Sequence, residues 1–250
     1  MLTVILSLAL LISPQESPPT PSPERVAEVV KNIEQTLKRG TDDERVRLLT
    51  RASDVPSKEV AQVLKSSLKS KSPKVVSAAI QGLRWMQHPA ALEALQKAYA
   101  SNKALRKDVV LRLSMLKAIG QHGHVSSIKL LSHEIYASKN VDLIKVRIFG
   151  LGMIRHADSL KALFKLMNSN APHTVQNSMG ALRYSLMFLT GVDKGPKRES
   201  WVKWWRDNRK VFKMAPLSKA IPRRNLDYWA RYWGIDFISE RVTRREDRGL

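Results

Sequence analysis

Aromatic and arginine side chains gather near the C-terminus in a pattern that is suited to ligand binding. In residues 223–233 two aromatic pairs at i, i+4 spacing are flanked by arginines, namely Tyr228 with Tyr232, Trp229 with Trp233, and Arg223, Arg224 and Arg231. Asn225 is placed to cap the helix that this spacing predicts. Arginine beside stacked rings suits sugar rings, bases or other anionic ligands. The same helix would also dock its aromatic face onto the rest of the chain with its arginines in water, so both interpretations stay open.

Six further cations recur at matching places in predicted helices. They are Arg84, Arg112, Lys117, Arg147, Arg155 and Arg183. Arg112 and Arg147 occupy equivalent positions 35 residues apart. The other four lie towards helix C-termini, where the helix dipole favours a cation. The dipole does not explain why acidic residues are scarce on the same faces. We therefore expect these six cations, with the arginine and aromatic group of residues 223–233, to bind a partner.

Residues suited to catalysis or metal binding are sparse. The chain has no cysteine, which excludes thiolate metal sites and cysteine nucleophiles. The acidic residues of the central region lie far apart in sequence, and no G-x-S-x-G or phosphate-binding glycine motif occurs. One histidine falls in each predicted turn, but helices pack about 8–10 Å apart, whereas metal ligands lie near 2 Å from one ion. We predict no catalytic, cofactor-binding or metal-binding residue and no small-molecule substrate.

The charge balance predicts an anionic partner. Lys and Arg number 43 and Asp and Glu 22, which gives a net charge of +21. Residues 55–190 contribute 20 basic and 6 acidic residues, so a basic tail alone does not explain the excess. Such a charge attracts polyanions and speeds encounter with them. A protein or an anionic polymer (acidic polysaccharide or nucleic acid) is the expected partner, and a solvated basic surface without a dedicated ligand is the alternative.

The elements that must position these residues are helices. Apolar residues at i, i+3, i+4, i+7 and i+11 spacing place one stripe on a helix over residues 24–39, and Gly40 ends it. No segment alternates apolar and polar residues over enough positions to predict a strand. The chain is therefore expected to be all-α.

A repeat relates distant parts of the chain. Residues 76–95 and 144–163 match at an offset of 68, with identical residues at seven of the aligned positions, and residues 110–131 align between them. A period near 34 with two amphipathic helices in each unit is typical of an α-solenoid. The units are expected at 41–71, 72–102, 103–140, 141–170 and 171–213, after a capping helix at 24–39, and the third has a turn about three residues longer. Gly82, Gly150 and Gly180 lie within first helices, where close approach of a neighbouring helix would explain them.

This pattern resembles HEAT repeats over roughly residues 41–213. The resemblance implies a right-handed α-solenoid of about five helix pairs with N- and C-terminal capping helices, spanning residues 24–213. It specifies the architecture and leaves the function open. A basic, aromatic extension at 214–250 would pack on the solenoid or trail from it.

A second resemblance rests on the end of the repeat region. Leu189-Thr190-Gly191-Val192-Asp193, followed by the Trp201, Trp204 and Trp205 cluster, looks like the closing segment of many exported bacterial HEAT-repeat proteins. The three tryptophans share one helix face and are expected to seal the last unit. The likeness implies export and no particular activity.

The N-terminal segment resembles a secretion signal. An apolar run from Leu2 to Ile12 is too short to cross a bilayer as a helix, and five prolines follow between Pro14 and Pro23. We expect residues 1–23 to be a signal peptide and linker of a protein exported to the periplasm, the cell envelope or the outside. Retention of the run as an anchor, or a disordered apolar N-terminus, are the alternatives.

Together these features predict a non-catalytic scaffold that binds a protein or an anionic polymer on a basic solenoid face. The alternative is a nucleic-acid-binding protein, including an enzyme like the HEAT-like alkylpurine DNA glycosylases. Those enzymes hold DNA in a concave face with tryptophan and an acidic residue. No residue of this sequence matches such a site.

Overall fold

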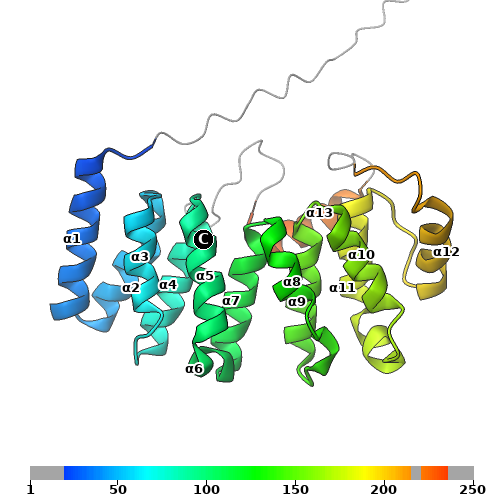
Figure 1. Cartoon of the computed structure of the whole chain (residues 1–250), viewed down its shortest axis with the longest axis horizontal. Coiled ribbons are helices and arrows are strands. Elements are labelled where there is room, and N and C mark those ends of the chain that lie inside the picture. The colour runs from blue at the N-terminus through cyan, green and yellow to red at the C-terminus, as the bar shows by residue number, and fades with distance from the viewer. Residues whose placement is uncertain (1–19, 215–220, 236–250) are drawn as a thin grey trace, which may run out of the picture.

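The structure is a computed structural model that describes residues 20–214 and 221–235, and these residues form helices and connecting turns without a strand. The helices stand side by side in an elongated array (Figure 1). The predicted all-α solenoid is confirmed. The expected signal segment and the end of the C-terminal extension, residues 1–19 and 236–250, lie outside the described residues. Within the described part, no helix is long and apolar enough to span a bilayer.

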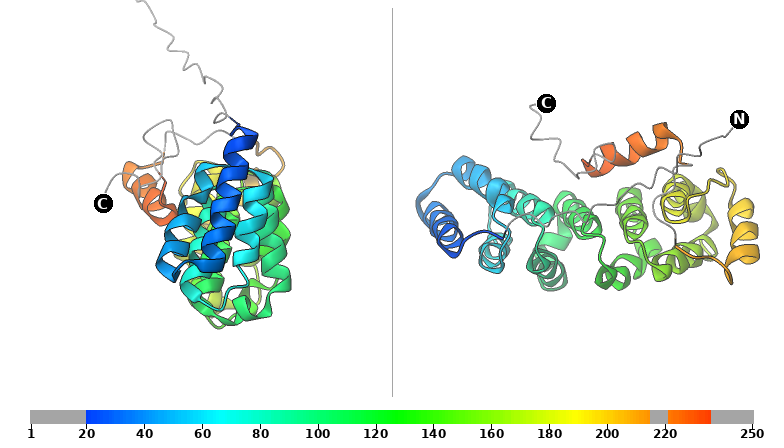
Figure 2. Two further views of the ribbon diagram at one scale, coloured as in Figure 1. Left: turned by 90° about the vertical axis from the view of Figure 1, so that its left-hand side faces the viewer. Right: turned by 90° about the horizontal axis from the view of Figure 1, so that it is seen from above.

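The array has two rows of helices. Row A consists of α2 (Asp42–Arg51), α4 (Pro73–Trp85), α7 (Val109–Gln121), α9 (Val141–Met153) and α11 (Pro172–Thr190). Row B consists of α1 (Pro23–Arg39), α3 (Lys58–Ser67), α5 (Pro89–Ser101), α8 (Ile128–Ser132), α10 (Ala157–Met167) and α12 (Arg198–Asn208). Each row A helix packs on the next helix of its row, and one continuous apolar core fills the space between the rows. A further helix, α13 (Arg223–Trp233), lies across row A on the hollow side of the bowed array (Figure 2).

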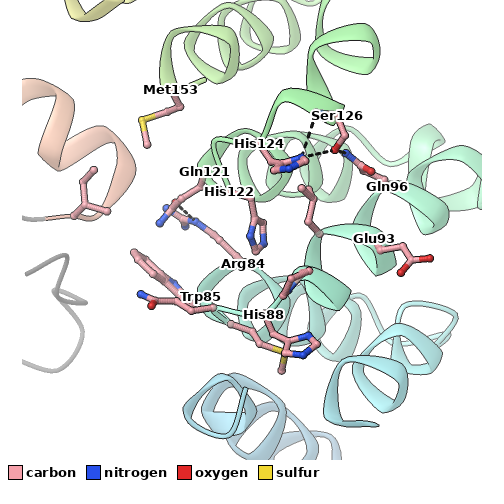
Figure 3. Close-up of a pocket in the computed structure, with 15 residues that line it drawn as sticks. Arg84, Trp85, His88, Glu93, Gln96, Gln121, His122, His124, Ser126 and Met153 are labelled. Carbon is pink, nitrogen blue, oxygen red and sulfur yellow. Dashed lines mark hydrogen bonds between the residues drawn. The ribbon is translucent and has the colours of Figure 1, made fainter. Parts of the chain in front are cut away.

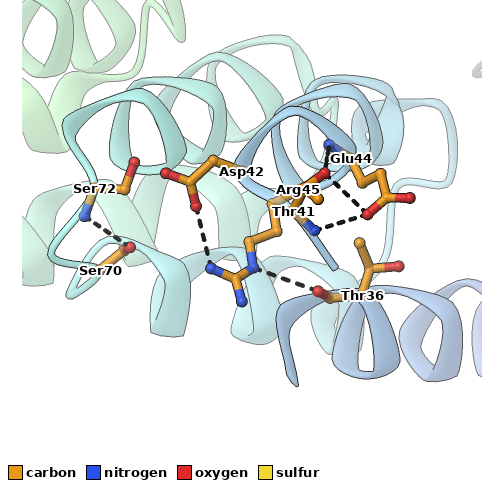
Figure 4. A network of polar contacts seen from close by, with 7 residues as sticks. All are labelled: Thr36, Thr41, Asp42, Glu44, Arg45, Ser70 and Ser72. Carbon is orange, nitrogen blue, oxygen red and sulfur yellow. Dashed lines mark hydrogen bonds and ion pairs between the residues drawn. The ribbon is translucent and has the colours of Figure 1, made fainter. Parts of the chain in front are cut away.

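Side-chain caps fix where the helices begin. At the start of α2, the Thr41 hydroxyl accepts a hydrogen bond from the Glu44 amide (3.3 Å) and the Glu44 carboxylate accepts one from the Thr41 amide (2.7 Å). Arg45 adds a hydrogen bond from its Nε to the Thr36 carbonyl near the end of α1 (3.4 Å) and an ion pair with Asp42 (3.2 Å; Figure 4). A reciprocal cap satisfies backbone groups that the first turn leaves free. These contacts set the angle between α1 and α2.

The third unit departs furthest from the repeat. The turn from α7 to α8, residues 122–127, is three residues longer than the α4–α5 turn, residues 86–88, which confirms the prediction. The structure also adds a short helix, α6 (Lys103–Lys107), before α7. The second helix of the unit, α8, has only five residues and lies between the 3₁₀ turns η2 (Val125–Ser127) and η3 (Ile135–Ala137). The extra residues therefore change both ends of the unit.

Two of the three helix glycines allow a neighbouring helix to approach closely. A Cβ on Gly82 would lie 2.3 Å from the Leu49 carbonyl oxygen of α2, and one on Gly150 would lie 3.0 Å from Leu131 Cδ1. Gly180 is different, because no atom lies within 4 Å of the position its Cβ would take. The prediction of a packing role is confirmed for Gly82 and Gly150 and wrong for Gly180.

The tryptophan cluster closes the array at α12. Trp201 is fully buried, and its Nε1 donates to the Gly195 carbonyl (2.8 Å). The ring of Trp205 stacks on Phe164 of α10 with centroids 4.7 Å apart. The chain turns from α11 into this cap through Gly191, whose φ of 75° is in the left-handed region that glycine adopts readily. The aromatic face thus covers the core of the last unit, as the sequence predicts.

Candidate functional site

The C-terminal aromatic helix α13 is docked on row A through its indole rings. Trp229 stacks on Phe188 with centroids 4.3 Å apart and meets Phe149 edge to face at 5.6 Å. Trp233 is fully buried, and a Cβ on Gly120 would lie 3.2 Å from its ring. Both indoles are therefore covered by the chain itself. The expectation that Trp229 and Trp233 stack on a ligand is corrected, and the packing interpretation applies to both.

Two predicted binding cations hold α13 in place. The Arg84 guanidinium is buried, and it donates to the Trp233 carbonyl and to Gln121 Oε1 (2.5 Å). The Lys117 ammonium lies over the Tyr232 ring, 4.7 Å from its centroid. Burial, with a smaller contribution from the charge of Arg84, lowers the pKa of Lys117 to about 8. Arg84 and Lys117 are thus contacts within the chain and are not available to a partner, which corrects the prediction.

The remaining residues of α13 divide between packing and exposure. The helix begins at Arg223 after Pro222, so Asn225 is not its cap; instead Asn225 is buried and its Nδ2 donates to Met187 Sδ (3.3 Å). Tyr228 stacks on Tyr184 with centroids 4.6 Å apart and is still 41% exposed. The arginines of this helix are exposed, namely Arg223, Arg224 and Arg231. The most exposed side chains of α13 are therefore Tyr228 and these three arginines.

Arg155 and Arg183 also make contacts within the chain. The Arg155 guanidinium donates to the Phe188 carbonyl (2.7 Å), which joins the end of α9 to α11. Arg183 forms a two-pronged ion pair with Asp193 at 2.8 and 2.5 Å. The hydrogen bond from Arg183 holds the pKa of Asp193 below its ordinary value. Four of the six cations predicted on row A are thus occupied, and the expected continuous stripe is wrong.

Arg112 and Arg147, the other two, converge as their matching positions predict. Arg112 Nε lies 3.4 Å and an Arg147 terminal nitrogen 3.1 Å from the Tyr99 hydroxyl oxygen. Arg147 also donates to the His133 carbonyl (2.7 Å). Burial would raise the pKa of Tyr99, but the hydrogen bonds from Arg147 and Arg112 leave it below its ordinary value. Neither arginine forms an ion pair with a carboxylate among the described residues.

Beside these arginines lies a lysine-rich edge, which we call the basic edge. It comprises Lys69, Lys71, Lys74, Lys103 and Lys107. These residues flank two successive turns from row B to row A, at the side of the array where α6 is labelled (Figure 1). The Asn102 side chain donates to the Leu68 carbonyl (3.1 Å) and ties the two turns together.

The basic edge has little acidic counterpart. All five lysines are exposed, and none forms an ion pair with another residue in the described ranges. Residues 68–107 contain eight Lys or Arg and one acid, Glu93, which pairs with Lys97. Arg106 is not counted in the edge, because its guanidinium donates to the Ala100 carbonyl (2.6 Å). The sequence shows the lysines, but only the fold shows that the two turns adjoin.

A pocket of about 600 Å³ opens at the opposite helix ends, between the α4–α5 and α7–α8 turns (Figure 3). His88 lines it and caps α5 by accepting a hydrogen bond from the Ala90 amide at Nδ1 (3.1 Å). His122 Nε2 lies 3.0 Å from the Leu83 carbonyl, and burial lowers the pKa of this histidine. No group of three residues suited to hold a metal occurs among the described residues.

One acid, Glu93, lines this pocket. Glu93 lies on the other side of the pocket from Trp85 (Figure 3). The hydrogen bond from Lys97 lowers the pKa of the Glu93 carboxyl. The arrangement offers no acid beside a tryptophan of the kind that the glycosylase alternative requires.

Comparison with known families settles the repeat type. Residues 30–114 match the family model described as HEAT repeats. The helix pairs within residues 30–114 are therefore HEAT repeats. No curated protein matches the chain. HEAT repeats generally serve as non-catalytic scaffolds for protein–protein interaction, so the surface of the solenoid is where function is to be sought.

Proposed function

We propose that this protein docks an acidic segment of a partner protein on the basic edge. The observation that carries the proposal is the presence of five exposed lysines on two adjoining turns without a carboxylate partner among the described residues. Arg112 and Arg147 extend the same positive surface towards α9. Binding is non-catalytic, and the repeats serve as a rigid frame that holds the cations in register.

Charge distribution supports the basic edge over other surfaces. The edge lies in a stretch that is poor in acids, because residues 68–107 contain eight Lys or Arg and the single acid Glu93, whose carboxylate already pairs with Lys97. An unpaired cluster of like charges repels itself, and an acidic segment relieves that repulsion when it binds. Because exposed charges are screened over about 8–10 Å at physiological salt, the affinity should fall as salt is raised.

The proposal is tested with a fluorescently labelled poly-glutamate peptide as the probe. Replacing Lys71, Lys103 and Lys107 by Gln removes three edge cations, and each exposed pair contributes about 0.5 kcal/mol, so we expect the affinity to fall roughly tenfold. Fluorescence anisotropy titrations at low and physiological salt measure it.

A matched control removes three exposed lysines elsewhere, Lys31, Lys165 and Lys203, also by replacement with Gln. The net charge changes equally in the two variants, and we expect the control to bind like the unaltered chain. Equal losses in both would show that net charge alone matters and would contradict a defined edge. Tighter binding of duplex DNA than of poly-glutamate would contradict a protein partner.

We also propose that the protein works outside the cytoplasm, in the cell envelope or beyond it. The proposal is supported by the apolar run from Leu2 to Ile12 and the proline-rich linker. A fusion of residues 1–23 to alkaline phosphatase, which is active only after export, should be active in a bacterial host. An inactive fusion would refute export.

A further inference from the structure

The cluster of Tyr99, Arg112 and Arg147 lacks the acceptor that its donors need. Tyr99 lies in α5 of row B and is 7% exposed, whereas Arg112 and Arg147 come from α7 and α9 of row A and are half-buried. Three different helices, α5, α7 and α9, therefore build the cluster. The groups sit on helices that are held by the core, so their relative placement is fixed.

The Tyr99 hydroxyl is restricted by its two arginine partners. A phenol oxygen accepts up to two hydrogen bonds and donates one. Arg112 Nε at 3.4 Å and Arg147 at 3.1 Å use both acceptor directions, which leaves the O–H to donate away from them. No acceptor for this O–H is found among the described residues, and a donor left without one is costly when it is shielded from water.

The charge of the cluster is also uncompensated. Arg147 uses one terminal nitrogen for Tyr99 and the other for the His133 carbonyl, while neither terminal nitrogen of Arg112 has a hydrogen bond within residues 20–214 and 221–235. Neither guanidinium has a carboxylate partner in the described part of the chain, and the basic edge adds more positive charge nearby. Two guanidinium groups side by side repel each other unless an anion lies between them.

We propose that Tyr99, Arg112 and Arg147 form a binding site for a tetrahedral oxyanion, a phosphate or sulfate ester carried by the docked protein segment. Three donors from different helices suit an anion with three outward oxygens, whereas a carboxylate offers two oxygens in one plane. A phosphate ester has a charge of about −1.5 to −2 at neutral pH, which matches two guanidinium groups. The identity of the partner as a protein rests on the proposed function, but binding of the free anion does not.

Isothermal titration calorimetry of the full chain with inorganic phosphate, sulfate and acetate, at constant ionic strength, tests the site. Phosphate and sulfate should bind at least about tenfold more tightly than acetate. Tyr99→Phe and Arg147→Lys should each weaken phosphate binding about tenfold. The first variant removes a hydrogen-bond donor, and the second keeps the positive charge but loses the two-pronged geometry of the guanidinium group.

Arg198→Lys is the control, since Arg198 likewise donates to a backbone carbonyl, that of Met167 (2.8 Å). Melting temperatures show that each variant is folded.

A second titration identifies the source of the anion. An acidic peptide with one phosphoserine should bind about tenfold more tightly than the same peptide with serine, and Arg147→Lys should abolish the difference.

Equal binding of phosphate and acetate, or an unchanged phosphate affinity in Arg147→Lys, would overturn the site. Phosphate binding without a gain from phosphoserine would overturn its assignment to a partner protein. If either of these results is found but the chain still binds poly-glutamate, the proposed function stands and only the anion site or its assignment fails. If the chain binds phosphate but not poly-glutamate, the anion site stands and only the proposed function fails.

Discussion

At the scale of single residues, the cations of row A differ in what their charged groups contact. Arg84 reaches a backbone carbonyl of α13, Arg183 reaches the carboxylate of Asp193, and Arg147 reaches a hydroxyl. Periodicity places all of them on one row, because equivalent positions repeat along a solenoid. Periodicity does not show which group each side chain contacts, because that group can lie as far away in the chain as Trp233. A cation on a regular stripe is therefore a site candidate only after its contacts within the chain are known.

His122 provides a pH-dependent prediction at this scale. Burial lowers its pKa in the folded chain below the ordinary value of 6.5, and the neighbouring His124 charge acts in the same direction. The unfolded chain then binds more protons below about pH 6.5, so stability should fall as pH drops from 7 to 5. Urea unfolding of the unaltered chain and of His122→Gln across this range measures the effect. If the free energy of unfolding falls by the same amount in both chains between pH 7 and 5, the assignment of this pH dependence to His122 is contradicted.

At the scale of elements, helix boundaries follow from local chemistry, whereas docking does not. Caps such as Thr41 with Glu44, and turn residues such as Gly191, are readable in the sequence because they act within a few residues. The sequence left the position of α13 open, because its aromatic face suits a ligand or a protein surface equally well. The structure decides it through Phe149 and Phe188, which lie 80 and 41 residues away from Trp229 in the chain.

The helix glycines give a matched pair of predictions. Gly82→Ala should destabilise the fold, because the added methyl group would meet the Leu49 carbonyl oxygen at 2.3 Å, which is a backbone atom. Gly180→Ala should stabilise it by about 1 kcal/mol, since alanine is the better helix former and nothing occupies the space. Urea denaturation of the two variants compares them. An unchanged or raised stability in Gly82→Ala would contradict the packing described for α2 and α4, and a loss in Gly180→Ala would contradict the open space beside α11.

At the scale of the whole molecule, the excess charge has a defined location. Composition predicts an anionic partner, and the repeat predicts the solenoid that is observed. Neither predicts the basic edge, because that surface requires the α3–α4 and α5–α6 turns to adjoin through Asn102 and Leu68. Helix α13 lies on the hollow side of the array (Figure 2) and adds its own exposed Arg223, Arg224 and Arg231, whereas the basic edge lies on the turns.

The most direct test of the central claim is a map of amide NMR shifts as poly-glutamate is added to the isotope-labelled protein. Docking on the basic edge predicts shifts confined to residues 69–74 and 103–107 and to Arg112 and Arg147, and these shifts should reverse as salt is raised. Shifts centred on α13, or spread evenly over the surface, would contradict the account.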